Sequence, residues 1–215
     1  MNQENKIYLF DFDGTLVDSM PTFRCIMKRV MESNGLEFTD DTLKIVTPLG
    51  YRGSAKYFQS FGVPEDEDTI TARMEAYAKE AYETTVPAKE GVPETLRELK
   101  ARGASLNILT ASPHVTLDAC LKRLGIWELF DHVWSCEDFG TVKSNPALYV
   151  TVAGELGVSV GEVIFVDDNV GSVKTAKSAG MISFGIYDPS SEDYIDEMRE
   201  VSDRYLCRFC ELLED

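Results

Sequence analysis

Five short apolar runs constrain the fold of this chain more than any other feature. They occupy residues 6–13, 104–109, 132–135, 163–166 and 181–186. Runs without polar alternation are typical of strands that are buried on both faces, as in a parallel sheet. Segments with helical spacing that end at glycine accompany the later runs, at residues 93–102, 113–124, 146–156 and 172–179. This alternation predicts an α/β fold in which helices cover both faces of a sheet.

The connection between the first two runs is far longer than a single crossover helix requires. It contains four further segments with helical spacing, at residues 20–33, 39–49, 54–61 and 65–84. We therefore expect an α/β core domain made of residues 1–19 and 87–215. A helical domain of residues 20–86 would be inserted into it.

The composition limits the classes of partner. The chain of 215 residues has 37 acidic and 21 basic side chains, giving a net charge of −16. Such a surface repels nucleic acids and anionic membranes, because affinity for phosphate polymers depends mainly on Lys and Arg. We therefore expect neither nucleic acid nor membrane as a partner.

Other sequence features indicate the compartment. The five cysteines are odd in number and scattered, and neither a signal peptide nor a stretch of about 20 apolar residues is visible. These observations favour a cytoplasmic protein with reduced thiols, which we expect to be a monomer or a weak dimer.

Two carboxylates stand at the end of the first apolar run. Asp11 and Asp13 are two residues apart, so on a strand they project from the same side. Open parallel sheets bind ligands beyond the carboxyl ends of their strands, and Gly14 permits a tight departure of the chain at this point. Two such carboxylates can divide the work of nucleophile and general acid–base.

The segment Asp11-Phe-Asp-Gly-Thr-Leu-Val-Asp-Ser19 resembles the opening motif of the haloacid dehalogenase (HAD) superfamily of phosphohydrolases. Residues 106–112 resemble the second motif, Lys143 stands at the position of the third, and residues 164–169 resemble the fourth. The resemblance covers nearly the whole chain and is strongest to the phosphoglycolate phosphatase and β-phosphoglucomutase-like branch. It implies a Rossmann-like parallel sheet of strand order 5-4-1-2-3, with the helical insertion as a cap domain.

The resemblance also implies catalytic roles. Asp11 would attack phosphorus and form an aspartyl-phosphate, while Asp13 would protonate the leaving group and then accept a proton from water. Thr110 and the backbone amide of Ala111 would hold the phosphoryl oxygens, and Lys143 would neutralise the nucleophile and the phosphate. These roles imply a phosphoric monoester hydrolase that acts on a small phosphorylated metabolite.

The same resemblance implies Mg²⁺ as the cofactor. Its ligands would be the Asp11 carboxylate, the Asp13 backbone carbonyl and Asp168, with Asp167 as a direct or outer ligand. Independently, two unit charges 4 Å apart repel by about 4 kcal/mol at an effective dielectric near 20, so converging carboxylates require cations. A divalent ion with oxygen ligands and Lys143 would supply them.

Two positions favour hydrolysis over the nearest rival, a sugar-phosphate mutase. Relatives of that kind tend to carry a histidine where this chain has Phe23, and to lack the pair Thr15-Leu16. A halide-cleaving reaction has no use for Asp13, whereas a phosphonate-cleaving reaction would use a cap lysine, for which Lys28 and Lys56 are candidates. A non-catalytic ligand- or partner-binding protein, the third alternative, would have lost a key carboxylate, and none is lost.

Several residues have both a functional and a structural interpretation. Arg52 and Lys56 in the insertion could contact the anionic end of a substrate, or could be solvated cations at a helix start. The Lys143 segment reads Val-Lys-Ser with Pro146 displaced, where the family usually has Gly-Lys-Pro. His114 could line the cleft or lie at the surface. Residues 205–213 are expected to form a helix in which Cys207 and Cys210 share one face and pack in the core.

Overall fold

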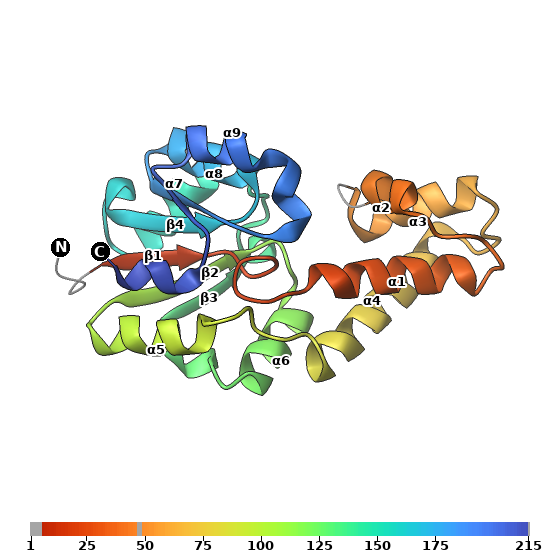
Figure 1. Cartoon of the computed structure of the whole chain (residues 1–215), viewed down its shortest axis with the longest axis horizontal. Helices are drawn as coiled ribbons and strands as arrows, with labels where there is room; N and C mark the ends of the chain where they lie inside the picture. The colour runs from red at the N-terminus through yellow and green to blue at the C-terminus, as the bar shows by residue number, and fades with distance from the viewer. Residues whose placement is uncertain (1–5, 47–48, 215) are drawn as a thin grey trace. The chain divides into compact units, whose positions relative to one another are not determined.

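The computed structural model describes residues 6–46 and 49–214. The chain divides into two compact units, which we describe separately (Figure 1). Unit 1 comprises Met1–Asp18 and Pro87–Asp215, and unit 2 comprises Ser19–Val86.

Unit 1 is built on a six-stranded sheet in which every neighbouring pair of strands is parallel. The order is β3-β2-β1-β4-β5-β6. It therefore contains the expected order 5-4-1-2-3 and adds β6 at the edge beside β5. The strands are β1 (Ile7–Phe10), β2 (Ser105–Thr110), β3 (His132–Ser135), β4 (Val163–Asp167), β5 (Ile182–Ile186) and β6 (Arg204–Leu206).

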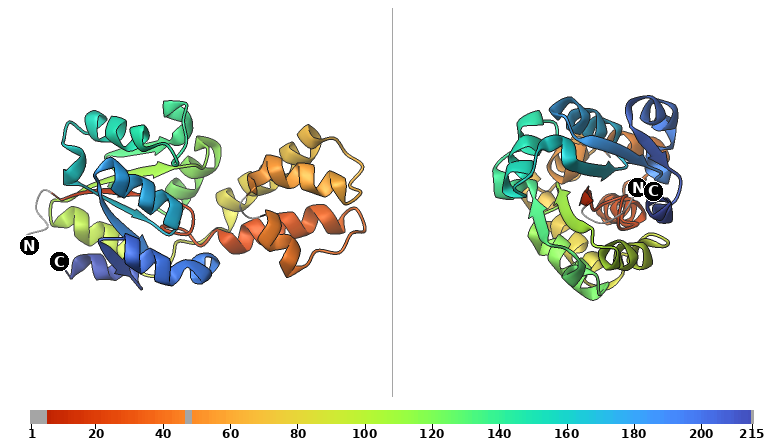
Figure 2. Two further views of the ribbon diagram at one scale, coloured as in Figure 1. Left: turned by 90° about the horizontal axis from the view of Figure 1, so that it is seen from above. Right: turned by 90° about the vertical axis from the view of Figure 1, so that its left-hand side faces the viewer.

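Helices lie on both sides of this sheet, as Figures 1 and 2 show. Apolar residues of β1 and β4, such as Leu9 and Phe165, are fully buried, which explains why these strands lack polar alternation. They form one core cluster with Tyr149 and Val152 of α7. The helices are α5 (Val92–Ala101), α6 (His114–Arg123), α7 (Pro146–Glu155), α8 (Val170–Ala179) and α9 (Ile195–Val201).

The end of the chain differs from the sequence-based expectation. Residues 205–213 do not form one helix: β6 extends the sheet, and the 3₁₀ helix η6 (Phe209–Leu213) follows it. Leu206 and Phe209 are buried, whereas Cys207 is exposed, so the predicted core packing of Cys207 is wrong. The physical reason is backbone pairing with β5, which gives three residues a strand conformation despite their helical spacing.

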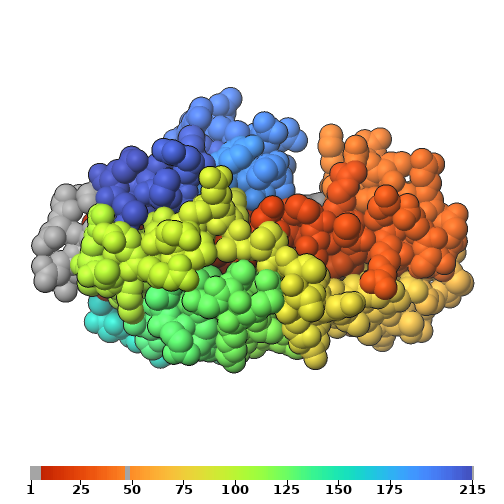
Figure 3. Space-filling model, turned by 60° about the horizontal axis from the view of Figure 1, so that its bottom comes forward, coloured from red at the N-terminus to blue at the C-terminus, as the bar shows by residue number. Residues whose placement is uncertain are grey.

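Unit 2 consists of helices α1 (Met20–Glu32), α2 (Asp40–Val46), α3 (Gly50–Ser60) and α4 (Glu67–Thr84). In the space-filling view of Figure 3, α1 in orange-red and α4 in gold lie against each other. Each helix has a buried apolar stripe, which includes Met27 and Val30 on α1 and Ile70 and Met74 on α4. Helix α3 begins at Gly50, before the expected residue 54. Of the helix expected over residues 39–49, residues 47–48 lie outside the described residues.

The two chain segments that join the units pair with each other inside unit 1. Val17 forms an antiparallel bridge with Ala88. The N–H of Asp18 donates to the Pro87 carbonyl at 3.0 Å, and the N–H of Lys89 donates to the Leu16 carbonyl at 3.0 Å. The outgoing and returning segments are therefore fastened together. Over the part of the chain that the structure describes, no helix is both long and apolar enough to cross a membrane.

Candidate active site

The acidic residues meet at the carboxyl ends of adjacent strands. Asp11 directly follows β1, Thr110 ends β2, and Asp167 ends β4, with Asp168 next to it. Since β1 is paired with both β2 and β4, these positions share one edge of the sheet. This is the place where an open parallel sheet binds its ligands.

Lys143 lies between two of these carboxylates. Its ammonium forms ion pairs with Asp11 and, at 2.8 Å, with Asp167 Oδ2. The three side chains are 12%, 9% and 0% exposed, respectively. Burial opposes the charge of Lys143, but the two carboxylates outweigh it and raise the pKa of the ammonium. Lys143 therefore stays charged and supplies a fixed cation to the cluster.

The loop before α7 presents Lys143 despite the departure from Gly-Lys-Pro. Asn145 caps the helix by accepting a hydrogen bond from the N–H of Ala147 at 3.1 Å, and Pro146 occupies the first turn, where no N–H is needed. The Tyr149 hydroxyl donates to the Lys143 carbonyl at 3.0 Å. The displaced proline thus starts the helix, and a tyrosine one turn later fixes the backbone of Lys143.

Carboxylate oxygens of Asp11, Asp167 and Asp168 lie within 4.8 Å of one another. Burial and neighbouring negative charges raise the pKa of Asp168, and burial raises the pKa of Asp167 against the opposing charge of Lys143. Hard divalent cations prefer oxygen ligands of this kind, and a cation would relieve the repulsion within the cluster. The donor set therefore fits a divalent metal ion.

Gly14 and Thr15 hold Asp168 in place. The Thr15 hydroxyl donates to Asp168 Oδ1 at 3.0 Å and accepts the Asp168 N–H at 3.2 Å. Gly14 has a φ of +77°, and a Cβ there would lie 2.6 Å from Asp168 Oδ2. Sequence reasoning assigned Gly14 to the turn but missed both contacts with Asp168, because they join positions about 150 residues apart.

The second motif contributes Thr110 and Ser112. Thr110 is buried, and its hydroxyl accepts the Ser112 N–H at 3.1 Å, while Ala111 is exposed directly after β2. The Ser112 hydroxyl donates to Asp13. The helix expected over residues 113–124 begins at His114 with Pro113 at the capping position, so Ser112 lies before the cap.

The sequence model of the family described as haloacid dehalogenase-like hydrolase matches residues 8–186 of this chain. The chain belongs to this family. The predicted resemblance is thereby confirmed at the level of family and fold.

Named relatives of this HAD-like hydrolase span most of its length. It is 28% identical over 193 residues to a phosphoglycolate phosphatase from Colwellia psychrerythraea, covering 86% of this chain and 85% of that protein. It is 26% identical over 220 residues to an N-acetylmuramic acid 6-phosphate phosphatase from Pseudomonas aeruginosa, covering 94% and 96%. A crystal structure of a HAD family hydrolase from Deinococcus radiodurans, with bound phosphate and sodium, aligns with a TM-score of 0.76 at 26% identity. That alignment covers 98% of this chain and 94% of that one.

In unit 2 of the HAD-like hydrolase, the two cations singled out in the sequence differ in their surroundings. Arg52 forms ion pairs with Glu67 at 3.0 Å and Asp68 at 2.9 Å, which tie α3 to the start of α4. Lys56 is exposed. Lys28, the other lysine considered for imine chemistry, lies 3.7 Å from Glu32.

His114 connects α6 to the 3₁₀ helix η3 (Cys136–Phe139). Its Nδ1 lies 2.8 Å from Asp118 and its Nε2 lies 2.9 Å from Asp138. Hydrogen bonds that the protonated ring donates to both carboxylates raise the pKa of His114. The side chain is 39% exposed, so His114 is a partly exposed link between two elements rather than a buried residue.

Proposed function

We propose that this HAD-like hydrolase is a Mg²⁺-dependent phosphatase that hydrolyses small phosphorylated metabolites through an aspartyl-phosphate on Asp11. The observation that carries the proposal is the contact of Asp11 with Lys143, whose side chain is 12% exposed, within a cluster of carboxylates that fits a divalent cation. The named phosphatases among its relatives support the same reaction class. Their names differ in substrate, so the proposal specifies a class of phosphate ester and not one compound.

In the first step, an oxygen of Asp11 attacks phosphorus opposite the leaving group. The new bond joins Asp11 to phosphorus as the ester P–O bond breaks, and the leaving oxygen takes a proton from Asp13. The proton-donating form of Asp13 can be oriented by the Ser112 hydroxyl, which contacts its carboxyl group. The alcohol leaves, and Asp11 carries the phosphoryl group.

In the second step, water attacks the same phosphorus from the vacated side. Asp13, now a carboxylate, accepts the proton of the water while the bond between phosphorus and Asp11 breaks. Inorganic phosphate leaves, Asp11 is again a carboxylate, and Asp13 is again protonated. Each cycle therefore consumes one ester and one water and returns both side chains to their starting state.

The remaining side chains position charge. Lys143 keeps Asp11 in place and neutralises the phosphoryl oxygens, and Thr110 and the Ala111 amide lie at the end of β2 where they can bind those oxygens. Mg²⁺, when held by Asp11, the Asp13 carbonyl and Asp168, with Asp167 as a direct or outer ligand, would supply positive charge that offsets the phosphoryl group. Catalysis here is mostly positioning and charge stabilisation.

We further propose that residues 1–19 and 87–215 act as the catalytic core domain and residues 20–86 as a cap domain that selects the substrate. Arg52 and Lys56 are the cap cations that we assign to the non-reacting end of an anionic substrate. Substrate-selecting caps are common where chemistry must be kept from water. We also propose a cytoplasmic location, which the five free thiols support.

A phosphate-release screen tests the proposal. Sugar phosphates, phosphoglycolate and nucleotides are offered with Mg²⁺, with and without a chelator, to the wild type, to Asp11→Asn and to the surface control Asp196→Asn. We expect release by the wild type and the control only, and none with chelator. Isomerisation of a sugar phosphate without phosphate release would indicate a mutase instead. No turnover of any ester would favour a binding protein.

A further inference from the structure

Lys89 is a second lysine near the acidic cluster, and each N–H of its ammonium donates a hydrogen bond. Its ammonium donates to the Gly14 carbonyl at 2.5 Å, to the Tyr187 carbonyl at 2.7 Å and to Asp188 Oδ2 at 2.9 Å. An ammonium has three N–H donors, so each has one acceptor. The Asp188 side chain is 1% exposed and that of Lys89 is 18% exposed, so this ion pair is well shielded from water.

These three contacts join separate parts of unit 1. Gly14 belongs to the loop that follows Asp13, and Tyr187 and Asp188 belong to the segment after β5. Lys89 itself lies at the end of the returning segment, where its N–H donates to the Leu16 carbonyl. One side chain thus fixes the first loop of the site to the segment that follows β5 at the same edge of the sheet.

The Gly14 peptide is held from two sides. Its carbonyl accepts from Lys89, and its Cα lies so close to Asp168 that a Cβ would be 2.6 Å from Oδ2. A shift of this loop would therefore displace Asp168, and it would also move the carbonyl of Asp13, the preceding residue.

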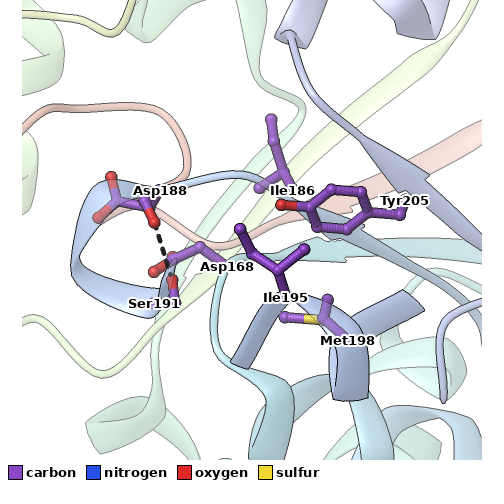
Figure 4. A pocket seen from close by; sticks show the side chains of 7 residues that line it. All are labelled: Asp168, Ile186, Asp188, Ser191, Ile195, Met198 and Tyr205. Carbon is purple, nitrogen blue, oxygen red and sulfur yellow. Dashed lines mark hydrogen bonds between the residues drawn. The ribbon is translucent and has the colours of Figure 1, made fainter. Parts of the chain in front are cut away.

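Asp188 is fixed independently of Lys89. Its Oδ1 accepts hydrogen bonds from the N–H and the hydroxyl of Ser190, at 2.9 and 2.5 Å. Figure 4 shows Asp188 and Asp168 among the residues that line one small pocket. In the same view the Ser191 hydroxyl contacts the Asp188 backbone carbonyl. The Asp188 turn is thus a rigid anchor for the Lys89 ammonium.

We propose that Lys89 is a positioning residue for the metal-binding edge of the site. Anchored on Asp188, it holds the Gly14 loop so that Asp168 and the Asp13 carbonyl converge on one divalent cation. This inference rests on the proposed function, because that function assigns those two groups to the cation. In this role Lys89 does not contact the reacting atoms.

The direction of the effect on metal binding separates positioning from charge. Removal of a positive charge near a cation site would, by electrostatics alone, tighten binding of the cation. Loss of positioning would weaken cation binding, because moving displaced ligands back into place costs free energy. A weaker affinity after removal of Lys89 is therefore specific to the positioning role.

The test compares Lys89→Met with the wild type. Mn²⁺ affinity of the substrate-free protein is measured by electron paramagnetic resonance, and kcat and KM are measured with p-nitrophenyl phosphate at saturating Mg²⁺. The matched control is Lys177→Met, which removes an exposed ion pair with Asp203 that is 2.8 Å long. Circular dichroism and the melting temperature report the folded fraction of each protein.

We expect Lys89→Met to bind Mn²⁺ about tenfold more weakly, a change of about 1.4 kcal/mol. We expect its kcat to fall by about tenfold or more, while its KM changes by less than about twofold. Lys177→Met should match the wild type in all three. Unchanged or tighter Mn²⁺ binding by folded Lys89→Met, or a kcat that falls only with the folded fraction, would overturn the inference.

Lys89→Arg keeps the test decisive if Lys89→Met does not fold. Arginine retains the charge and several donors but has a planar, longer head group, so it pairs with Asp188 while shifting the Gly14 carbonyl. We expect a folded protein with weakened Mn²⁺ affinity, and wild-type affinity would count against positioning. If the wild type binds Mn²⁺ but hydrolyses no ester, the proposed phosphatase function is wrong. The Mn²⁺ affinities of the variants then decide the positioning role of Lys89 without the kinetic data.

Discussion

Replacement of Gly14 by alanine perturbs the backbone and Asp168 together. At a φ of +77°, a residue with a Cβ costs about 1–2 kcal/mol relative to glycine. The new Cβ would also lie 2.6–2.7 Å from three atoms of the Asp168 carboxyl group, which is 9% exposed and held by Thr15. Overpacking of a buried site costs about 1–3 kcal/mol. The combined loss of stability should be about 2–5 kcal/mol.

Gly157→Ala is the matched control for this substitution. Gly157 has a φ of +71°, lies in the same unit and has no atom within 4 Å of the position of a Cβ. It should therefore lose only the backbone contribution of about 1–2 kcal/mol. The difference between the two variants isolates the contact with Asp168.

Urea unfolding followed by tryptophan fluorescence measures this difference in unit 1 alone, because the only two tryptophans are Trp127 and Trp134. Mn²⁺ affinity is measured on the same samples, since displacement of Asp168 should weaken it in Gly14→Ala and leave it unchanged in Gly157→Ala. Equal stability losses and equal Mn²⁺ affinities in the two variants would refute the argument that Gly14 is required by its approach to Asp168.

Three further predictions concern single side chains. Asp168→Ala should raise the Mg²⁺ concentration needed for half-maximal turnover at least tenfold. It should not lower the metal-free melting temperature, because the substitution also removes one of several buried negative charges. Normal Mg²⁺ dependence would exclude Asp168 as a ligand. The raised pKa of His114 means that its stabilising contribution is fully present below pH 6.5 and is lost as the pH rises through that raised pKa. His114→Gln should therefore reduce the difference in unfolding free energy between about pH 5.5 and about pH 8.5, and an unchanged difference would contradict this assignment. Arg52→Ala should raise KM severalfold for phosphate esters with a second anionic group and leave KM unchanged for esters whose non-reacting end is uncharged. Melting temperature is recorded in parallel because Arg52 also ties α3 to α4.

The sequence contained enough information for the strands and for the placement of the principal side chains. Apolar runs such as residues 163–166 indicate strands buried on both faces, and the acids that follow such strands lie at one edge of a parallel sheet. Proximity of Asp11 to Asp167 follows from that geometry. Lys143 could be placed only through the family resemblance, because its loop has no periodicity.

Contacts between distant positions could not be predicted in the same way. The pairing of Thr15 with Asp168 spans 153 positions, and that of Lys89 with Asp188 spans 99. Nothing local distinguishes such a threonine or lysine from one at the surface. Strand β6 was missed for a related reason, since its three residues are held by the edge of β5 rather than by their own preference.

Because Val17 pairs with Ala88, the helical insertion could be removed from the chain without breaking the backbone pairing inside unit 1. Because the backbones of Asp18 and Pro87 are already hydrogen-bonded neighbours, a turn of a few residues could replace everything between them without stretching either end. Recombination at this point could exchange the proposed cap domain while the proposed catalytic core stays intact. Under that proposal, substrate selection could change through the exchange of one module, without changes to the residues to which we assign the chemistry.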